Sequence, residues 1–277
     1  MTDGPGQRSQ PGPSQPGPPQ YEIPRSVTPT AAVVLAANPG SMTLEGTNTW
    51  LLRAPGCESA IVVDPGPDHQ SHLLPVIAAA GRVEQILLTH GHADHSASAW
   101  RLAELTGAPV RALDPRARLG EDAGLVEGDV VVAAGLEVRV LATPGHTSDS
   151  LCFVLADGAG SAVLTGDTIL GRGTTVIAHP DGELGPYLRS LRRLVELGDV
   201  TVLPGHGPEL ASAAVAATAY LAHREQRLEQ VRAALSVLGP DAGAQAVLEL
   251  VYADVDRALW RAAAWSVRAQ LAYLRSS

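Results

Sequence analysis

The chain contains 277 residues with a formal net charge of −9, and all 20 of its basic residues are arginine. This length allows one large domain, or one domain with a smaller second one. The acidic balance argues against a strong electrostatic grip on nucleic acid, so we do not expect duplex DNA as a partner. The two cysteines, Cys57 and Cys152, lie far apart in the chain, which predicts two reduced thiols and a cytoplasmic protein.

The N-terminal residues 1–26 consist mostly of glycine, proline, glutamine and serine. Such a segment cannot bury enough apolar surface to offset the entropy that ordering costs, so we predict a disordered tail. The first apolar run, over residues 30–37, predicts the first strand. No apolar stretch of the chain approaches the ~20 residues that cross a bilayer, so no membrane association is expected.

Two further strands, over residues 49–52 and 60–63, and a helix over residues 73–80 are predicted before the central motif. His69 and His72 lie in a polar turn ahead of this helix. We therefore expect both histidines at the surface and not at a metal.

The central motif places three imidazoles and one carboxylate within six residues: His90, His92, Asp94 and His95. It directly follows the short apolar run of residues 86–88, which predicts a buried strand, so these side chains lie on the loop at the strand's carboxyl end. Nitrogen and carboxylate donors suit zinc, iron or manganese. His90 and His92 alternate and can point the same way, while Asp94 and His95 turn to a second point. One cluster can therefore serve two metal ions.

Three more apolar runs end in a turn that contains glycine and one metal-type side chain; these side chains are His146, Asp167 and His206. Glycine allows the backbone to bend sharply after a strand and to present the neighbouring side chain. Four strand ends that each deliver such a side chain predict one convergent metal site. Five histidines and two carboxylates are the right number of donors for two ions of coordination number four or five.

Short apolar runs between residues 110 and 140 are broken by glycines and predict strands and turns of a second half-sheet. Helices are predicted over residues 96–106, 184–195, 209–238, 242–252 and 256–274. Residues 221–277 contain seven arginines and six acidic residues, which is not the strongly basic face of a typical nucleic-acid reader. Trp260 and Trp265 could stack on bases, but their spacing favours core packing.

The order and spacing of the metal-type residues resemble the metallo-β-lactamase superfamily over residues 38–207. Within it, the segment 38–52 is similar to the opening of the β-lactamase-like protein 2 family. The resemblance implies a four-layer αββα sandwich over residues 27–220, preceded by the tail of residues 1–26. A small, helical, winged-helix-like domain is expected over residues 221–277, on a likeness of helix pattern and of the segment His223-Arg224-Glu225.

The superfamily pattern also implies roles for the metal-type residues. It assigns His90, His92 and His146 to one metal ion and Asp94, His95 and His206 to the other, with Asp167 bridging the two. Asp94 is expected in addition to orient the catalytic hydroxide. The expected cofactors are two Zn²⁺ ions, with iron or manganese as alternatives.

Three other residues have a role only by resemblance. Asp64 is expected to brace the histidine loop without binding metal; as a residue before Pro-Gly it could equally be a plain turn former. His179 and Tyr187 lie where the family has residues near the substrate. The alternatives are a surface position for His179 and core packing for Tyr187.

The resemblance implies a dinuclear metal-dependent hydrolase that uses a metal-bridging hydroxide as its nucleophile. The β-lactamase-like protein 2 family suggests an endoribonuclease-like enzyme for single-stranded RNA. A hydroxyacylglutathione hydrolase-type thioesterase, or another ester, lactone or lactam hydrolase, is the alternative. A non-catalytic, metal-stabilised binding module is the alternative of another class. The expected partners are a small-molecule or single-stranded RNA substrate and a second copy of the chain.

Overall fold

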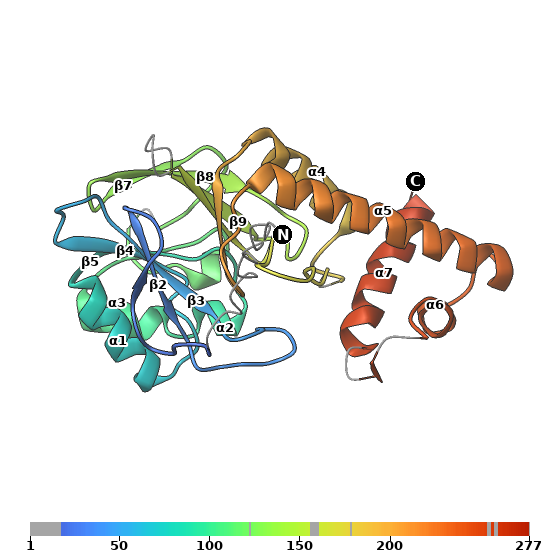
Figure 1. The fold of residues 1–277 in the computed structure, drawn as a ribbon, viewed down its shortest axis with the longest axis horizontal. Helices are drawn as coiled ribbons and strands as arrows, with labels where there is room; N and C mark the ends of the chain where they lie inside the picture. The colour runs from blue at the N-terminus through green and yellow to red at the C-terminus, as the bar shows by residue number, and fades with distance from the viewer. Residues whose placement is uncertain are drawn as a thin grey trace, which may run out of the picture.

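The computed structural model describes residues 18–121, 123–155, 161–177, 179–253, 256–257 and 260–276. Two β-sheets pack face to face, and helices cover their outer faces (Figure 1). A further group of helices extends to one side of this body, at the right of Figure 1. The predicted four-layer αββα sandwich with C-terminal helices is confirmed.

The first sheet has six strands and carries the N-terminal half of the fold. In sheet order, the strands are β1 (Arg25–Ser26), β2 (Ala31–Leu35), β3 (Asn48–Leu52), β4 (Ser59–Val63), β5 (Arg82–Leu87) and β6 (Val110–Arg111). Neighbours are antiparallel from β1 to β4 and parallel from β4 to β6. A parallel connection needs a crossover, and α1 (Gln70–Ala80) and α3 (Ala99–Thr106) supply the two crossovers.

The second sheet has five strands in the order β11 (Thr201–Pro204), β10 (Ala162–Gly166), β9 (Leu151–Leu155), β8 (Leu136–Ala142) and β7 (Val130–Ala133). Only β10 and β11 are parallel, and α4 (Leu184–Glu196) connects them. Two short elements, α2 (Ala93–Ser96) and the 3₁₀ turn η1 (Pro115–Ala117), follow β5 and β6.

The four layers explain why several strands are buried along their full length. Strands β3, β4, β9 and β10 have no exposed residue, because one face meets the other sheet and the opposite face meets helices. Trp50 and Phe153 pack between the sheets, while α1 and α3 cover the first sheet and α4 covers the second. Strands buried on both faces lose the alternating pattern of half-exposed strands.

The C-terminal part consists of α5 (Ala213–Leu238), α6 (Ala244–Val251) and α7 (Trp260–Ser276). The Ser212 hydroxyl caps α5 by accepting the Val215 N–H, and Gly239 follows its last turn. Helix α5 begins against α4 and continues into the outlying helices, so the domain boundary that we predicted between residues 220 and 221 falls inside one continuous helix (Figure 1).

The predicted winged-helix character finds no counterpart in the described C-terminal residues. Within residues 213–253, 256–257 and 260–276 the chain forms helices and no strand, so no wing is seen there. The apolar faces of the three helices instead meet in a small core around Val231, Leu248 and Val267.

The expected tail of residues 1–26 is too long at its C-terminal end. Residues 1–17 lie outside the described part, but Tyr21 forms a bridge with Leu35, and β1 pairs with β2. The Glu22 carboxylate also accepts the Ala37 N–H at 3.0 Å. These backbone contacts are long-range pairings that a composition argument cannot detect.

His72 is buried, contrary to our prediction of a surface residue. Helix α1 starts at Gln70, so His72 lies in its first turn and faces the sheet with 0% exposure. Its Nδ1 lies 2.6 Å from a Glu22 oxygen and its Nε2 lies 2.8 Å from the Thr49 hydroxyl. These two partners, distant in sequence and outside the polar turn, are what allow the histidine to be buried.

Both cysteines are unpaired, as predicted; Cys57 is half-buried and Cys152 is buried. Among the described residues, no helix is both long enough and apolar enough to span a membrane.

Candidate metal centre

The loop after β5 presents four polar side chains within one turn of chain. It is held against the second sheet, since the Thr89 carbonyl accepts the Leu151 N–H at 2.7 Å. The short helix α2 begins at Ala93 and turns Asp94 and His95 away from the direction of His90 and His92. The loop therefore serves two groups of ligands, as its spacing predicts.

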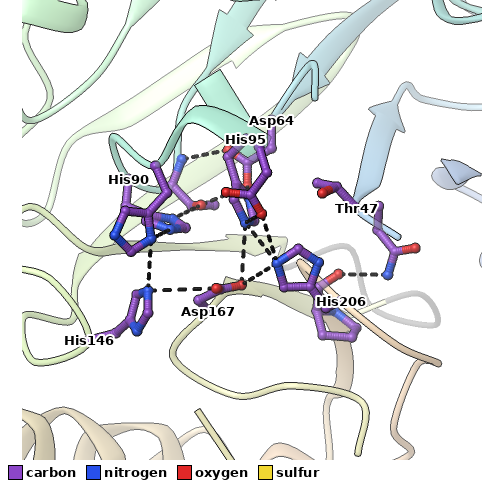
Figure 2. Close-up of polar contacts among 12 residues, drawn as sticks. Thr47, Asp64, His90, His95, His146, Asp167 and His206 are labelled. Carbon is purple, nitrogen blue, oxygen red and sulfur yellow. Dashed lines mark hydrogen bonds and ion pairs between the residues drawn. The ribbon is translucent and has the colours of Figure 1, made fainter. Parts of the chain in front are cut away.

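The other three side chains reach the same place from the second sheet (Figure 2). His146 follows β8, Asp167 follows β10 and His206 follows β11. Candidate ligand atoms fall into two groups, each within 4.8 Å: the first is His90, His92, His146 and Asp167, and the second is Asp94, His95 and His206. The structure thus brings together all seven side chains that the sequence analysis selected.

Asp167 lies between the two groups. Its Oδ2 is 3.6 Å from His146 Nε2 in the first group. Its Oδ1 is 3.4 Å from both His95 Nε2 and His206 Nε2 in the second. Oδ1 is buried and has no hydrogen-bond partner among the described residues. A buried carboxylate oxygen normally has a partner, so this atom fits a position beside a cation.

The outer ring nitrogens leave the inner ones free to bind metal. His146 Nδ1 donates to the Val176 carbonyl at 2.6 Å, His206 Nδ1 to the Gly46 carbonyl at 3.1 Å, and His95 Nδ1 to Asp64 at 2.8 Å. A neutral imidazole that donates from Nδ1 presents a lone pair at Nε2. The Nε2 atoms of His95 and His206 face each other at 3.2 Å, which is the arrangement expected of two nitrogens that share one ion. The residues present therefore fit a divalent metal centre.

Asp64 contacts the histidine loop at three points. Its carboxylate accepts the Thr89 N–H at 2.8 Å, the Thr89 hydroxyl at 2.6 Å and His95 Nδ1–H at 2.8 Å. The Thr89 oxygen in turn lies 3.0 Å from His90 Nδ1 and accepts its proton. Asp64 thus orients one ligand of each group while it stays outside both. Its φ of 52° is left-handed, a conformation that aspartate tolerates better than most residues.

Two glycines next to the ligands are needed for close approach. A Cβ at Gly205 would lie 2.6 Å from His95 Cε1 and 2.8 Å from Asp167 Oδ1. A Cβ at Gly166, where φ is +46°, would lie 2.4 Å from the Thr89 hydroxyl oxygen. The glycines that precede His206 and Asp167 therefore make room for the opposite strand end, besides turning the chain.

Charge separates the two groups. Burial lowers the pKa of His90 well below its usual value, and it lowers the pKa of His146 as well; neighbouring imidazoles act in the same direction. In the second group, burial again disfavours the charged form, but the Asp167 and Asp94 carboxylates together outweigh it and raise the pKa of His206 to about 9. Burial likewise opposes ionisation of Asp94, yet His206 and His95 lower its pKa to about 2. The carboxylates thus concentrate negative potential where a cation would bind.

The two predicted substrate residues do not join this cluster. Tyr187 has 0% exposure, packs α4 onto the second sheet, and donates its hydroxyl proton to the Thr168 carbonyl at 2.8 Å. Full burial contradicts a substrate contact, and the packing alternative fits. His179 is half-buried beyond the strand ends, with its N–H bonded to the Ile177 carbonyl at 2.8 Å, and belongs to neither ligand group.

A cavity of about 320 Å³ opens beside the cluster, and His146 and Asp167 form part of its wall. The facing wall comes from the C-terminal helices, which sequence reasoning had left without a role. Its polar members are His223, Arg224, Arg227 and Ser266, with Tyr252 beside them, whereas Arg172 lines the cavity from the segment after β10. The pattern His223-Arg224-x-x-Arg227 was the available signal, since residues three and four apart share one side of a helix.

A second hollow, of about 480 Å³, lies on the His92 side of the cluster. It is lined mainly by polar residues, including Asp114, Arg116, Ser148 and Asp181. Arg116 is paired with Asp114 at 2.7 Å, and the Ser148 hydroxyl donates to Asp181 at 2.6 Å. The charged and polar side chains of this hollow therefore pair with one another.

Comparison with known proteins identifies the class. The sequence profile of the Metallo-beta-lactamase superfamily matches residues 42–206, so the chain belongs to this superfamily and is a hydrolase. A Drosophila melanogaster protein named beta-lactamase-like protein 2 homolog is 32% identical over 278 residues, which cover 91% of this chain and 90% of the relative. An Aspergillus fumigatus protein named atrochrysone carboxyl ACP thioesterase is 33% identical over 246 residues, covering 83% of this chain and 75% of the relative.

The solved structures agree on the fold. A beta-lactamase domain protein from Burkholderia ambifaria superposes with a TM-score of 0.74 and 24% identity, covering 92% of this chain and 90% of its own. The metallo-β-lactamase sandwich with C-terminal helices is therefore the fold of the chain, and a His/Asp cluster at its strand ends indicates that a divalent metal binds there.

Proposed function

We propose that the chain is a dinuclear metal-dependent thioesterase that hydrolyses an acyl thioester of a small thiol or of a carrier-bound thiol. The observation that carries this proposal is the position of Asp167, which lies between two ligand groups and also lines the 320 Å³ cavity. A scissile carbonyl in that cavity would lie directly at the cluster. Cavities of this size are typical of small-molecule sites.

The donor set decides which metals fit. Five imidazoles and two carboxylates suit zinc, with iron and manganese as alternatives. When bound, two such ions lower the pKa of water to roughly 7 and polarise the substrate carbonyl. The chain's own part is to set the ligand positions through Asp64, Thr89 and the carbonyls of Val176 and Gly46.

Asp94 is the side chain that we assign to the attacking water. Its pKa is lowered to about 2, so the carboxylate is ionised at neutral pH. It is 30% exposed and lies 3.2 Å from His206 Nε2, so it can accept a hydrogen bond from a water molecule at the cluster. The water oxygen forms the new C–O bond, the C–S bond breaks, and the thiol leaves with one of the water's protons. The products are a carboxylic acid and a free thiol.

A thioester has more support than single-stranded RNA. The chain has a net charge of −9, whereas RNA binding relies on many cationic phosphate contacts. A relative 33% identical over 83% of this chain is named a thioesterase. Because the chain also resembles the β-lactamase-like protein 2 family, which suggests an RNA substrate, single-stranded RNA is the competing substrate that the test must include.

The test is a side-by-side turnover assay with metal-loaded protein on an acyl-glutathione thioester, an acyl-coenzyme A thioester, a single-stranded RNA oligonucleotide and a β-lactam. We expect thiol release from at least one thioester, with two metal equivalents by elemental analysis. Turnover of RNA or the β-lactam with both thioesters inert would contradict the thioesterase assignment. A stable content of one metal in metal-replete protein would contradict the dinuclear centre.

A further inference from the structure

We infer that α5 carries a binding site for an oxyanion of the substrate, a carboxylate or a phosphate, formed by Arg224 and Arg227 on the cavity wall that faces the metal cluster. The inference rests on the proposed function in one respect, because it takes the cavity to be the substrate site. It assigns a specificity role to a helix outside the superfamily's metal motifs.

Arg224 is a buried cation. Its exposure is 3%, and among the described residues no carboxylate lies within ion-pair distance of it. One Nη donates to the Thr175 carbonyl, and the guanidinium lies 5.2 Å from the centre of the Tyr187 ring. Its Nε is buried and has no partner among the described residues. Arginine cannot lose its proton to escape burial, and a buried charge without a counter-charge is costly.

Arg227 extends the same wall. It lies three residues further along α5, on the side that lines the cavity, and it stacks 4.9 Å from the centre of the Tyr252 ring. Its one described side-chain hydrogen bond goes to the neutral Gln230 oxygen at 2.9 Å. Two guanidinium groups thus face one cavity, and within the described part of the chain their partners are neutral acceptors and aromatic faces.

The neighbouring groups support a local positive potential. His223 lines the same cavity, and its Nδ1 is buried without a partner among the described residues. Burial, Arg224 and Arg227 together lower the pKa of His223. Arg172, at another part of the wall, is different because it is paired with Glu45. In a chain with a net charge of −9, two arginines without a carboxylate partner among the described residues are a local feature and not a reflection of overall charge.

The chemistry of guanidinium selects the ligand class. Its planar N–H groups bind carboxylate and phosphate oxygens with paired hydrogen bonds. Because His146 and Asp167 line the same cavity as both arginines, one bound molecule can contact both the cluster and the arginines. We therefore infer an acyl thioester that carries either a carboxylate on its acyl part or a phosphate on its thiol part.

Three thioesters distinguish a carboxylate on the acyl part from a phosphate on the thiol part. Glutaryl N-acetylcysteamine carries a carboxylate, pentanoyl-coenzyme A carries phosphates, and pentanoyl N-acetylcysteamine carries neither. The test variant is Arg227→Gln, because Arg224→Gln could impair folding. Arg232→Gln is the matched control: Arg232 is on the same helix, is exposed, pairs with Glu229 and does not line the cavity.

For Arg227→Gln we expect KM to rise about tenfold or more for one anionic thioester, with kcat changed less than about threefold. KM for the uncharged thioester and all constants of Arg232→Gln should stay at wild-type values. A rise for glutaryl N-acetylcysteamine identifies a carboxylate, and a rise for pentanoyl-coenzyme A identifies a phosphate. Equal changes for charged and uncharged thioesters, or none, would overturn the inference.

A binding measurement separates this inference from the proposed function. Isothermal titration of glutarate and of inorganic phosphate into wild type, Arg227→Gln and Arg232→Gln, at equal metal content, needs no turnover. We expect at least tenfold weaker binding of one anion to Arg227→Gln only. If that loss appears while no thioester is hydrolysed, the oxyanion site stands and the thioesterase assignment fails. Undiminished binding of both anions to Arg227→Gln would refute the site itself.

Discussion

Asp167 is the residue on which a paired centre depends, since its two oxygens face different ligand groups at 3.4 and 3.6 Å. The variant Asp167→Asn keeps the size of the side chain and removes its charge. We expect turnover to fall on the order of a hundredfold or more and one metal ion to become easier to remove by a chelator. Circular dichroism should be unchanged, because β10 is stabilised by apolar burial.

The control for this measurement is Asp68→Asn, which changes an exposed aspartate away from the ligand groups. Elemental analysis, circular dichroism and turnover are measured on the same preparations. Two tightly held metals with full activity in Asp167→Asn would remove Asp167 from the centre.

Asp64 acts on the centre through the residues that it holds. In Asp64→Asn, an NH₂ group replaces one oxygen and cannot accept the protons of Thr89 and His95. We expect metal affinity to fall about 10- to 100-fold, measured by competition with a chromophoric chelator, with the folded structure retained. An affinity equal to that of Asp68→Asn would show that Asp64 only forms the turn.

The metal cluster could be predicted from the sequence because each ligand directly follows an apolar run and sits in or beside a glycine turn. Local spacing was enough to select residues that the fold then brings together. The burial of His72, and the position of Arg224 on the cavity wall, could not be predicted in this way. Each depends on which face of a helix meets a neighbour, and that is set by packing between segments far apart in the chain.

At the scale of elements, α4 is tied to the second sheet by a charged contact. The Glu127 carboxylate accepts from Arg193 on α4 at 2.6 Å and from the Ala142 N–H on β8 at 2.7 Å. Hydrogen bonding from Arg193 lowers the pKa of Glu127, against a smaller opposing effect of burial. The folded chain therefore binds the Glu127 proton less readily than the unfolded chain, and acid favours unfolding.

Glu127→Gln tests this contact. At pH 7 we expect the variant to be less stable than wild type by about 0.2–1 kcal/mol, since the pair is half-exposed. The difference should persist down to the ordinary value of 4.5 and shrink at lower pH, as the unfolded wild type takes up the proton first. Urea unfolding at several pH values measures it. A difference that stays constant with pH, or one equal to that of the exposed-site control Glu104→Gln, would contradict the assigned ion pair.

Element boundaries show where sequence reasoning stops. The strands β2, β3 and β4 and the helices α1, α3 and α4 were predicted within a few residues, because apolar runs and glycine stops are local signals. The predicted end of the N-terminal tail was wrong, because the last residues of that range are ordered by distant partners. Strand β1 pairs with β2, and the Glu22 carboxylate contacts residues 15 and 50 positions away. Helix α5 likewise continues through the predicted boundary. An alanine-rich sequence does not indicate which element each turn of the helix packs against, so it gave no signal for the boundary.

At the scale of the whole molecule, α5 connects two hydrophobic cores. Its first half contributes Ala217 and Tyr220 to the core under the second sheet, and its second half contributes Val231 and Ala234 to the core with α6 and α7. Helix α7 also reaches the first of these cores through Ala269. The C-terminal helices therefore share structure with the sandwich and supply the cationic wall of its cavity.

This connection predicts one cooperative unfolding transition. Leu248 on α6 is 2% exposed in the outer core, whereas Leu250 on the same helix is 50% exposed. Truncating a buried leucine to alanine costs about 2–5 kcal/mol, and each kcal/mol shifts the melting temperature of a chain this long by roughly 2–4 °C. Leu248→Ala should therefore lower the single calorimetric transition of the whole chain by about 5 °C or more, with Leu250→Ala close to wild type. If calorimetry instead resolves two transitions and Leu248→Ala moves only the smaller one, the C-terminal helices fold independently and α5 does not couple them to the metal centre.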